Sequence, residues 1–349
     1  MLDPNTATFT GPLEAQQLKA ASHILVYALP ELMAAKLGSQ MGVPNNNGDQ
    51  LKFTYFDLFP VTGVSIIEGI PPASQPLVRR NVVLTLQQYG MWTPITDWTV
   101  DLHPDDIMEP ILRNLATWMA QTIEKVTLNS LLSGLNVLYA GGVASRAALA
   151  STITRQMVGR VNEIFNTFSA QKIKEIMSAS SGFATTPIAA SFVGIITPAM
   201  EDDLRHCANW KPVSSYSNPR AMLPNEVGNV DNVRFCTNVF LTPWLAAATS
   251  AASQTTFRSS NADTATGSAG SADVHPILFL AKDAFACANL NKTKSGEVKL
   301  RKPGMAVPGD ELGQTGSAGI KFWYASTILT DYYLIRGEAC VTNPSKVSW

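Results

Sequence analysis

Two neighbouring stretches of the chain alternate apolar and polar residues, and this period of two is typical of β-strands. The first stretch covers residues 51–59. The second covers residues 81–89 and places three apolar side chains on one face: Val82, Leu84 and Leu86. The sequence therefore predicts two strands that are able to pair with each other.

The segment that joins these strands, residues 60–80, is much longer than a hairpin loop, which needs only about two to five residues. A connection of this length is usually functional or disordered. Its charged residues Glu68, Arg79 and Arg80 suit contacts with a neighbouring molecule. A solvated loop explains the same composition equally well, so both interpretations stay open.

The strongest helical pattern covers residues 104–133. Apolar side chains recur there at the three–four spacing of an amphipathic helix: Met108, Ile111, Leu115, Trp118, Met119, Ile123 and Val126. Asp105 and Asp106 place negative charge in the first turn, where the helix dipole favours it. Pro110 predicts either a kink or the true first turn. About 30 residues would span roughly 45 Å, a length that suits a strut along a flat molecule.

Three further regions carry helical signals. Residues 13–37 predict a helix that Pro30 breaks or kinks. Residues 154–179 predict two helices joined near Ser169. Thr197 and Pro198 predict the cap and first position of a helix through about residue 210, because proline fits the first helical position.

The remaining patterns are those of strands and loops. Strands are predicted at 187–196, 230–241 and 275–282, with a closing strand or hairpin at 320–340. Loops are predicted at 42–48 and at 250–272, a stretch made mostly of Ser, Ala, Thr and Gly. Strands and helices do not alternate over many units, so the pattern fits neither a doubly wound sheet nor a barrel of eight units.

Charge is scarce and balanced. Charged residues make up 15% of the chain, against a usual value of about 25%, and the net charge is −1. This argues against a disordered chain and against a surface that attracts nucleic acid as a whole. The basic residues between 292 and 302 favour a solvated hairpin over a patch that faces phosphate groups. Two interpretations stay open: a soluble monomer, or a subunit whose surface lies largely against copies of itself.

The length of 349 residues suits one large or two modest domains. The four cysteines are too widely spread for a disulfide scaffold and fit free thiols in a reducing cytosol. The N-terminus lacks the basic and apolar regions of a secretion signal. The longest nearly apolar run, residues 187–196, is far shorter than the about 20 residues of a membrane helix, so no membrane partner is expected.

Motifs for catalysis are weak. The sequence contains neither a GxSxG elbow nor a GxxxxGK[ST] phosphate loop, and its four histidines form no HxxxH pair. His206 and Cys207, with Asp202 and Asp203, could suggest a metal or thiol site, but a helix cap and a satisfied histidine explain them better. The glycine-rich stretch 313–319 precedes a predicted strand, whereas a phosphate cradle precedes a helix. We therefore expect no enzyme, no catalytic residue, no cofactor and no metal.

Three blocks of residues occur in an order and spacing that are more specific together than any block alone. They are Gln88-Tyr89-Gly90 with Ile95-Thr96-Asp97 and Ile123-Glu124; Ile195-Ile196-Thr197-Pro198 with Asp203-Leu204-Arg205, Asn225-Glu226-Val227-Gly228 and Val233-Arg234-Phe235; and Lys282-Asp283-Ala284 with Pro303-Gly304, Asp310-Glu311-Leu312-Gly313-Gln314, Gly319-Ile320-Lys321-Phe322-Trp323 and Ile328-Leu329. From about residue 50 to 340, the chain resembles the major capsid proteins of tailed phages. Specifically, it resembles the coat protein family of the N-four-like podophages, which has the Hong Kong 97-type fold.

The resemblance implies an α+β fold with an elongated sheet and a defined set of parts. These are an N-terminal arm at 1–50, an extended E-loop hairpin at 51–95, a peripheral domain at 96–180 with a spine helix at 104–133, an axial domain at 181–300 with an insertion at 250–272, and a return to the peripheral domain at 301–349.

The implied function is structural. Copies would form hexamers and pentamers of an icosahedral virion shell, assembled in the cytoplasm of a host bacterium, that encloses double-stranded DNA without sequence-specific binding. Scaffolding, portal and decoration proteins would be separate partners, and Glu68, Arg79 and Arg80 would contact adjacent subunits. No lysine lies between residues 60 and 80, so we expect a shell without covalent crosslinks. An encapsulin-type compartment shell and a cytosolic enzyme are the alternatives.

Overall fold

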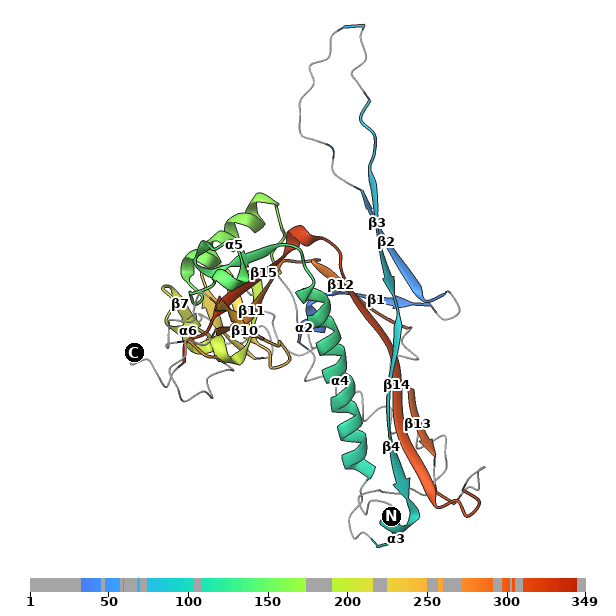
Figure 1. Ribbon diagram of the computed structural model, residues 1–349. Helices are drawn as coiled ribbons and strands as arrows, with labels where there is room; N and C mark the ends of the chain where they lie inside the picture. The colour runs from blue at the N-terminus through green and yellow to red at the C-terminus, as the bar shows by residue number, and fades with distance from the viewer. Residues whose placement is uncertain are drawn as a thin grey trace.

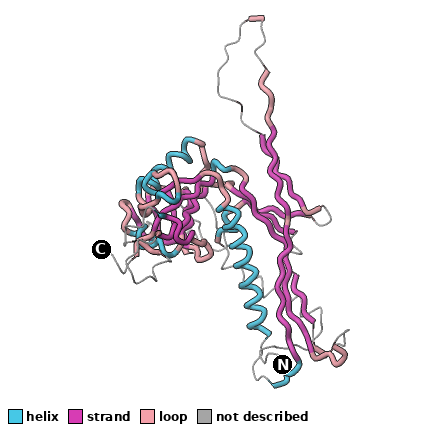
Figure 2. Tube along the Cα trace, viewed as in Figure 1, coloured by secondary structure: helices cyan, strands magenta, loops and turns pink. Residues whose placement is uncertain are grey.

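A computed structural model describes residues 33–44, 48–56, 59, 68–69, 74–102, 108–173, 190–215, 225–249, 257–259, 271–290, 297–301, 303–304 and 310–343. The molecule has a compact body, an elongated sheet with one long helix beside it, and a two-stranded ribbon that projects from one end of this sheet (Figure 1). Figure 2 shows the strands gathered in the compact body and in the elongated sheet, with the helices beside them. The α+β fold class is therefore confirmed.

The elongated part is built on β14 (Thr315–Ile328), which pairs antiparallel with β4 (Gln87–Thr96), β13 (Glu297–Arg301) and β12 (Phe285–Leu290). The long helix α4 (Met108–Leu132) packs along β14. Trp118 meets Phe322 edge-on with ring centroids 5.9 Å apart, and Tyr89 stacks on the same ring at 5.7 Å. The apolar stripe that predicts this helix is therefore the face buried on the sheet.

The long helix starts later than predicted. A short helix α3 (Asp97–Leu102) precedes it, residues 103–107 lie outside the described residues, and α4 begins at Met108. Pro110 falls in the first turn, where its missing N–H has no partner to lose. Of the two interpretations of Pro110, the true first turn is the one observed. At 1.5 Å per residue, the 25 residues of α4 span about 37 Å.

The projecting ribbon consists of β2 (Gln50–Phe56) and β3 (Arg79–Thr85), paired antiparallel with Leu51 opposite Leu84. The prediction of a single strand at 81–89 is wrong, because the chain breaks at Leu86 and continues as β4 in the elongated sheet. Leu86 is buried, and its N–H donates to Asp49 O at 2.8 Å. A small apolar cluster with Leu84 and Leu86 at its centre fixes the base of the ribbon to the sheet.

The first described elements are the one-turn helix α2 (Ala34–Leu37) and β1 (Ser39–Val43), which pairs parallel with β12. Most of the helix predicted at 13–37 lies outside the described residues, and only α2 is observed within it. The first two residues of the loop predicted at 42–48 belong to a strand, because β1 extends to Val43. Pairing with β12 overrides the local preference of this polar segment for a loop.

The compact body is a mixed sheet in the order β5-β15-β11-β6-β9-β8-β7, with β10 paired to β11. Its strands are β5 (Val137–Tyr139), β6 (Phe192–Ile196), β7 (Trp210–Pro212), β8 (Glu226–Val230), β9 (Val233–Thr237), β10 (Trp244–Ala248), β11 (Ala272–Leu280) and β15 (Leu334–Cys340). The helix α5 (Arg155–Thr167) packs against this sheet through Val158, Val161 and Phe165. One apolar core therefore combines segments from before residue 181 and after residue 300.

Two strand predictions for the later part of the chain are wrong in detail. The stretch 230–241 contains the end of β8, a turn at Asp231 with φ of 51°, and β9. The closing segment 320–340 is no hairpin, because β14 and β15 pair in different sheets. The turn η7 (Asp331–Tyr333) carries the chain from one sheet to the other. Residues 187–189 of the strand predicted at 187–196 lie outside the described residues.

The later helix predictions are too long. After Pro198, the short turn η4 (Pro198–Met200) leads into α6 (Glu201–Arg205), and β7 begins at Trp210. Helix α5 ends at Thr167, and Ser169 has a φ of 52° that continues no helix. Residues 170–173 are not helical, and the rest of the second helix predicted up to 179 lies outside the described residues. Most of the loop predicted at 250–272 lies outside them as well.

Candidate functional site

The structure places Arg79 and Arg80 side by side at the start of β3, on the exposed ribbon. Arg79 lies opposite Phe56 and Arg80 opposite Tyr55 in the strand register. The Arg79 guanidinium donates to Thr54 Oγ1 at 3.3 Å. Glu68 lies apart from them, in an exposed two-residue turn at 68–69, and most of the chain around it lies outside the described residues. Because successive side chains of a strand point to opposite faces, Arg79 and Arg80 lie on opposite faces of the ribbon, and Glu68 belongs to another part of the connection.

The ribbon combines exposed apolar side chains with positive charge. Phe56 and Val83 are each just over half exposed. Its strands carry Lys52, Arg79 and Arg80 and no carboxylate. A two-stranded hairpin without a covering layer is only marginally stable in water. The composition and isolation of the ribbon thus fit a segment that lies on another surface, and that surface should be apolar and acidic.

The opposite end of the elongated part carries two of the most exposed large apolar side chains among the described residues. Trp98 on α3 is 75% exposed, and Leu312 in the turn before β14 is 81% exposed. The two segments are held together because the Asp97 N–H donates to Gln314 O at 3.0 Å. Neither residue was predicted from the sequence. The signal available was an isolated tryptophan directly after a strand, which a single sequence does not distinguish from a core residue.

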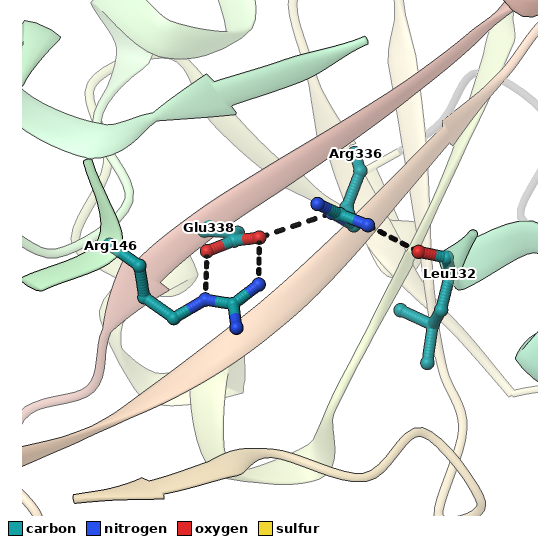
Figure 3. A network of polar contacts seen from close by, with 4 residues as sticks. All are labelled: Leu132, Arg146, Arg336 and Glu338. Atoms are coloured by element: carbon teal, nitrogen blue, oxygen red, sulfur yellow. Dashed lines mark hydrogen bonds and ion pairs between the residues drawn. The ribbon is translucent and has the colours of Figure 1, made fainter. Parts of the chain in front are cut away.

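A charged network joins the compact body to the long helix (Figure 3). Glu338 on β15 is fully buried and accepts two hydrogen bonds from Arg146, at 2.6 and 2.7 Å. Arg336 forms a further ion pair with Glu338 at 3.1 Å and also donates to Leu132 O at the end of α4. The Arg146 guanidinium lies over the Trp244 ring, 3.7 Å from its centroid. The bonds to Glu338 raise the pKa of Arg146, so they favour its charged form.

A second buried carboxylate fixes the start of the described chain. Glu124, in the middle of α4, accepts hydrogen bonds from the backbone N–H groups of Met33, Ala34 and Ala35, the Ala34 bond being 2.7 Å long. The Asn238 amide donates to the same carboxylate at 2.7 Å. Burial raises the pKa of Glu124, and these four bonds oppose that shift. Glu124 therefore acts as a cap for α2 supplied by a distant element.

The side chains around Cys207 form a structural cluster. Asp203 is buried and accepts from the Thr342 N–H at 2.9 Å, and the Cys207 thiol donates to Ile153 O at 3.4 Å. Burial, together with the Asp203 carboxylate, raises the pKa of Cys207 to about 11. His206 Nδ1 lies 2.8 Å from Asp202 O. These contacts favour the helix-end interpretation over a reactive thiol, because a thiol with a raised pKa is a poor nucleophile.

Two other sequence features have structural explanations. The glycine-rich stretch 313–319 is a turn followed by the first residues of β14, and a Cβ at Gly316 would come within 2.6 Å of Arg301 O. In the basic segment, Lys299 pairs with Glu297, which also pairs with Lys321 on β14. β12 and β13 each pair with β14 rather than with each other, so the predicted hairpin at this point is wrong. Lys292, Lys294 and Lys302 lie outside the described residues.

A cavity of about 940 Å³ lies where the compact body meets the elongated part, lined in part by Lys36, Lys172, Lys282 and Asp283. Asp283 accepts a hydrogen bond from Ser39 at 2.7 Å. Among the described residues, no group of three or more His, Cys, Asp or Glu side chains is placed to hold a metal ion. None of the helices in the described ranges combines the length and apolar character that a bilayer crossing requires.

This arrangement of compact body, elongated sheet, long helix and ribbon is a fold of phage capsid proteins. The chain is similar to the capsid of Ralstonia phage GP4, with a TM-score of 0.61 and 12% identity over 88% of each chain. It is similar to the head structure of Helicobacter pylori bacteriophage KHP40, with a TM-score of 0.60 and 12% identity over 88% of each chain. It is also similar to the capsid of cyanophage Pam1, with a TM-score of 0.56 and 14% identity over 87% of this chain and 89% of the other.

At these identities the similarity establishes the fold alone. No protein-family model and no curated protein matches the sequence. The fold is therefore assigned from three-dimensional similarity over most of the chain, and not from sequence similarity.

Proposed function

We propose that this protein is the major capsid protein of a tailed phage, with a Hong Kong 97-type fold of the N-four-like kind. The observation that carries the proposal is the match to phage capsid structures over 88% of both chains. A match of that coverage extends over most of the chain, so it does not rest on one common motif. The role proposed is structural, without catalysis or a cofactor.

Each part of the molecule has a proposed place in the shell. The ribbon β2–β3 supports an E-loop within residues 51–95, and α4 supports a spine helix within 104–133. We propose a peripheral domain within 96–180 and 301–349, of which α4 and β14 lie in the elongated part, whereas β5, α5 and β15 lie in the compact body. We place the axial domain in the compact body, which the sequence located within 181–300 and whose core also takes in α5 and β15. Residues 1–50 are proposed as an arm.

The proposed assembly is a closed icosahedral shell of hexamers and pentamers in the virion, formed in the cytoplasm of the host bacterium. Contacts between unlike surfaces of identical subunits generate rings when the rotation closes. The exposed ribbon supports such a contact because it gains apolar burial only on another molecule. Scaffolding, portal and decoration proteins would be separate chains, and the DNA would be enclosed without sequence-specific contacts.

Electron microscopy of the expressed protein tests this proposal. We expect negatively stained particles in the form of shells, capsomers or tubes. A uniform monomer at every concentration would contradict the proposal. Nucleic acid inside the shells would support a phage capsid, whereas a protein cargo would support the encapsulin-type alternative.

A further inference from the structure

The cavity where the compact body meets the elongated part has walls that are fixed to one another, and we call it the junction pocket. Its walls come from the end of α2 and the start of β1, the segment after α5, the residue range just before β6, and the turn between β11 and β12. The Lys282 N–H donates to Gln171 O at 3.0 Å, and the Ser39 hydroxyl donates to Asp283 at 2.7 Å. The segment after α5 is also bridged to the residue that precedes β6. The junction pocket is therefore held by contacts between all of its walls.

Charge in the junction pocket is positive. Among the described residues that line it, Lys36, Lys172 and Lys282 carry ammonium groups and Asp283 carries a carboxylate. Three cations against one anion leave an excess of two positive charges, in a chain whose net charge is −1. The Lys172 ammonium lies 5.7 Å from the centroid of the Phe192 ring, which favours a position at the wall of the pocket. Like charges around one cavity repel each other, so an anion between them is favourable.

The type of cation favours phosphate over carboxylate. Arginine presents a planar fork that matches a carboxylate with two parallel hydrogen bonds, whereas lysine is a compact point charge that binds phosphate groups. The described lining of the junction pocket contains lysines and no arginine. A phosphate ester carries about −1.5 to −2 charges at neutral pH, which balances the excess in the pocket.

The volume of the junction pocket indicates a ligand larger than phosphate alone. About 940 Å³ lies within the range of about 300–1,000 Å³ that is usual for pockets of organic ligands. The walls also supply apolar side chains at Leu37 and Ile173 and an amide at Gln171. A few polar groups among apolar ones are typical of sites that hold an organic ligand in one orientation. A phosphate ester of nucleotide size therefore fits both the charge and the volume.

We propose that the junction pocket binds a phosphate ester of nucleotide size, with the ammonium groups of Lys36, Lys172 and Lys282 around its phosphate. The same chemistry is present in a free nucleotide and in a nucleotide unit of a nucleic-acid strand. The pocket adds a ligand to the proposed structural function and does not depend on shell formation.

Isothermal titration calorimetry of the full chain tests the site. We expect thymidine 5′-monophosphate and a single-stranded oligothymidylate to bind, and thymidine, which lacks the phosphate, not to bind. Lys172→Gln and Lys282→Gln should each weaken binding of the monophosphate about fivefold or more, because each removes a charged partner of the phosphate. Lys211→Gln, at an exposed lysine on β7, is the control and should leave binding unchanged.

Asp283→Asn gives a change of opposite sign. It removes the carboxylate from the lining and keeps an oxygen that accepts from Ser39. We expect the monophosphate to bind severalfold more tightly, because one repulsive charge is lost. A variant with a damaged fold would bind more weakly, and thermal unfolding checks that each variant is folded.

The proposal is overturned if thymidine binds as tightly as its monophosphate, if neither phosphate-bearing probe binds, or if the two lysine variants bind as the wild type does. Tighter binding of the strand than of the monophosphate identifies a nucleic-acid strand as the source of the phosphate. Equal or tighter binding of the monophosphate identifies a free nucleotide. Electron microscopy scores particle formation separately, so a failure to form particles contradicts the proposed function and not this site.

Discussion

At the scale of single residues, several buried charges in the described part of the chain are paired with opposite charges. Glu338 has no solvent exposure, and Arg146 and Arg336 both pair with it. Arg234 and Glu226 form another buried pair, at 3.1 Å, between β9 and β8. Removing one member of such a group leaves a buried charge uncompensated, which costs more than the pair contributes.

Glu338→Gln should lower the free energy of unfolding of the unassembled subunit by about 2–4 kcal/mol, because both arginines lose their ionic partner. Urea denaturation measures the change. Glu163→Gln is the matched control, since Glu163 forms an exposed pair with Arg160 and should change stability by less than about 0.5 kcal/mol. If the two variants are equally stable, the network does not hold the compact body to α4.

Burial of His275 should make the free energy of unfolding depend on pH. It is buried, its Nδ1 lies 2.9 Å from Thr197 Oγ1, and burial lowers its pKa to about 4 from 6.5; Asp273 opposes this shift and Arg258 adds to it. Between these pH values the unfolded chain binds a proton that the folded chain does not. His275 therefore contributes stability above pH 6.5 that is lost as the pH falls towards 4, by about 3 kcal/mol at most.

His275→Asn keeps a polar partner for Thr197 and removes the titrating ring. The difference in unfolding free energy between wild type and variant should change across pH 4–6.5, with the wild type losing more stability as the pH falls. A constant difference across this window would show that His275 titrates normally in the folded protein.

At the scale of elements, the sequence predicts what depends on local pattern and misses what depends on distant partners. The observed bounds of helix α4 and strand β2 lie within a few residues of the bounds predicted from their periodicity. The break at Leu86 was missed because it depends on a distant partner, β14, which pairs with β4. The exposed arginines of the candidate site were found as charges in a long connection, but the exposed surface at Trp98 and Leu312 is formed by segments more than 200 residues apart.

The position of α2 depends on its hydrogen bonds to Glu124. Glu124→Gln keeps the oxygen that meets Ala34 and Asn238 and loses the acceptor for Met33 and Ala35. Hydrogen exchange of the amides at 33–37 should then accelerate about tenfold or more, since a hydrogen bond to a charged group contributes about 1.5–3 kcal/mol. Glu109→Gln, at an exposed site on the same helix, should leave these amides unchanged. Equal exchange in both variants would mean that Glu124 does not hold α2.

At the scale of the whole molecule, the charge of the chain is low and nearly balanced. The 26 Lys and Arg residues nearly balance the 27 Asp and Glu residues over the whole chain, although strands β2 and β3 carry three cations and no carboxylate. Such a subunit suits repeated head-to-tail contacts with copies of itself. A chain with this balance cannot hold DNA through overall attraction, so the proposed shell encloses the genome rather than binding it tightly.

The absence of lysine between residues 60 and 80 predicts a shell held by non-covalent contacts alone. Assembled particles should separate under denaturing electrophoresis into one band at the subunit mass of 37.6 kDa. Ladders of higher mass that survive denaturant and reductant would contradict this prediction.

The most direct test of the central claim is a cryo-electron microscopy reconstruction of the assembled particle. We expect a closed shell in which the elongated parts tile the surface and the ribbon of each subunit lies against a neighbouring subunit. A particle that is not a shell, or a shell in which the ribbons extend free into solvent, would contradict it.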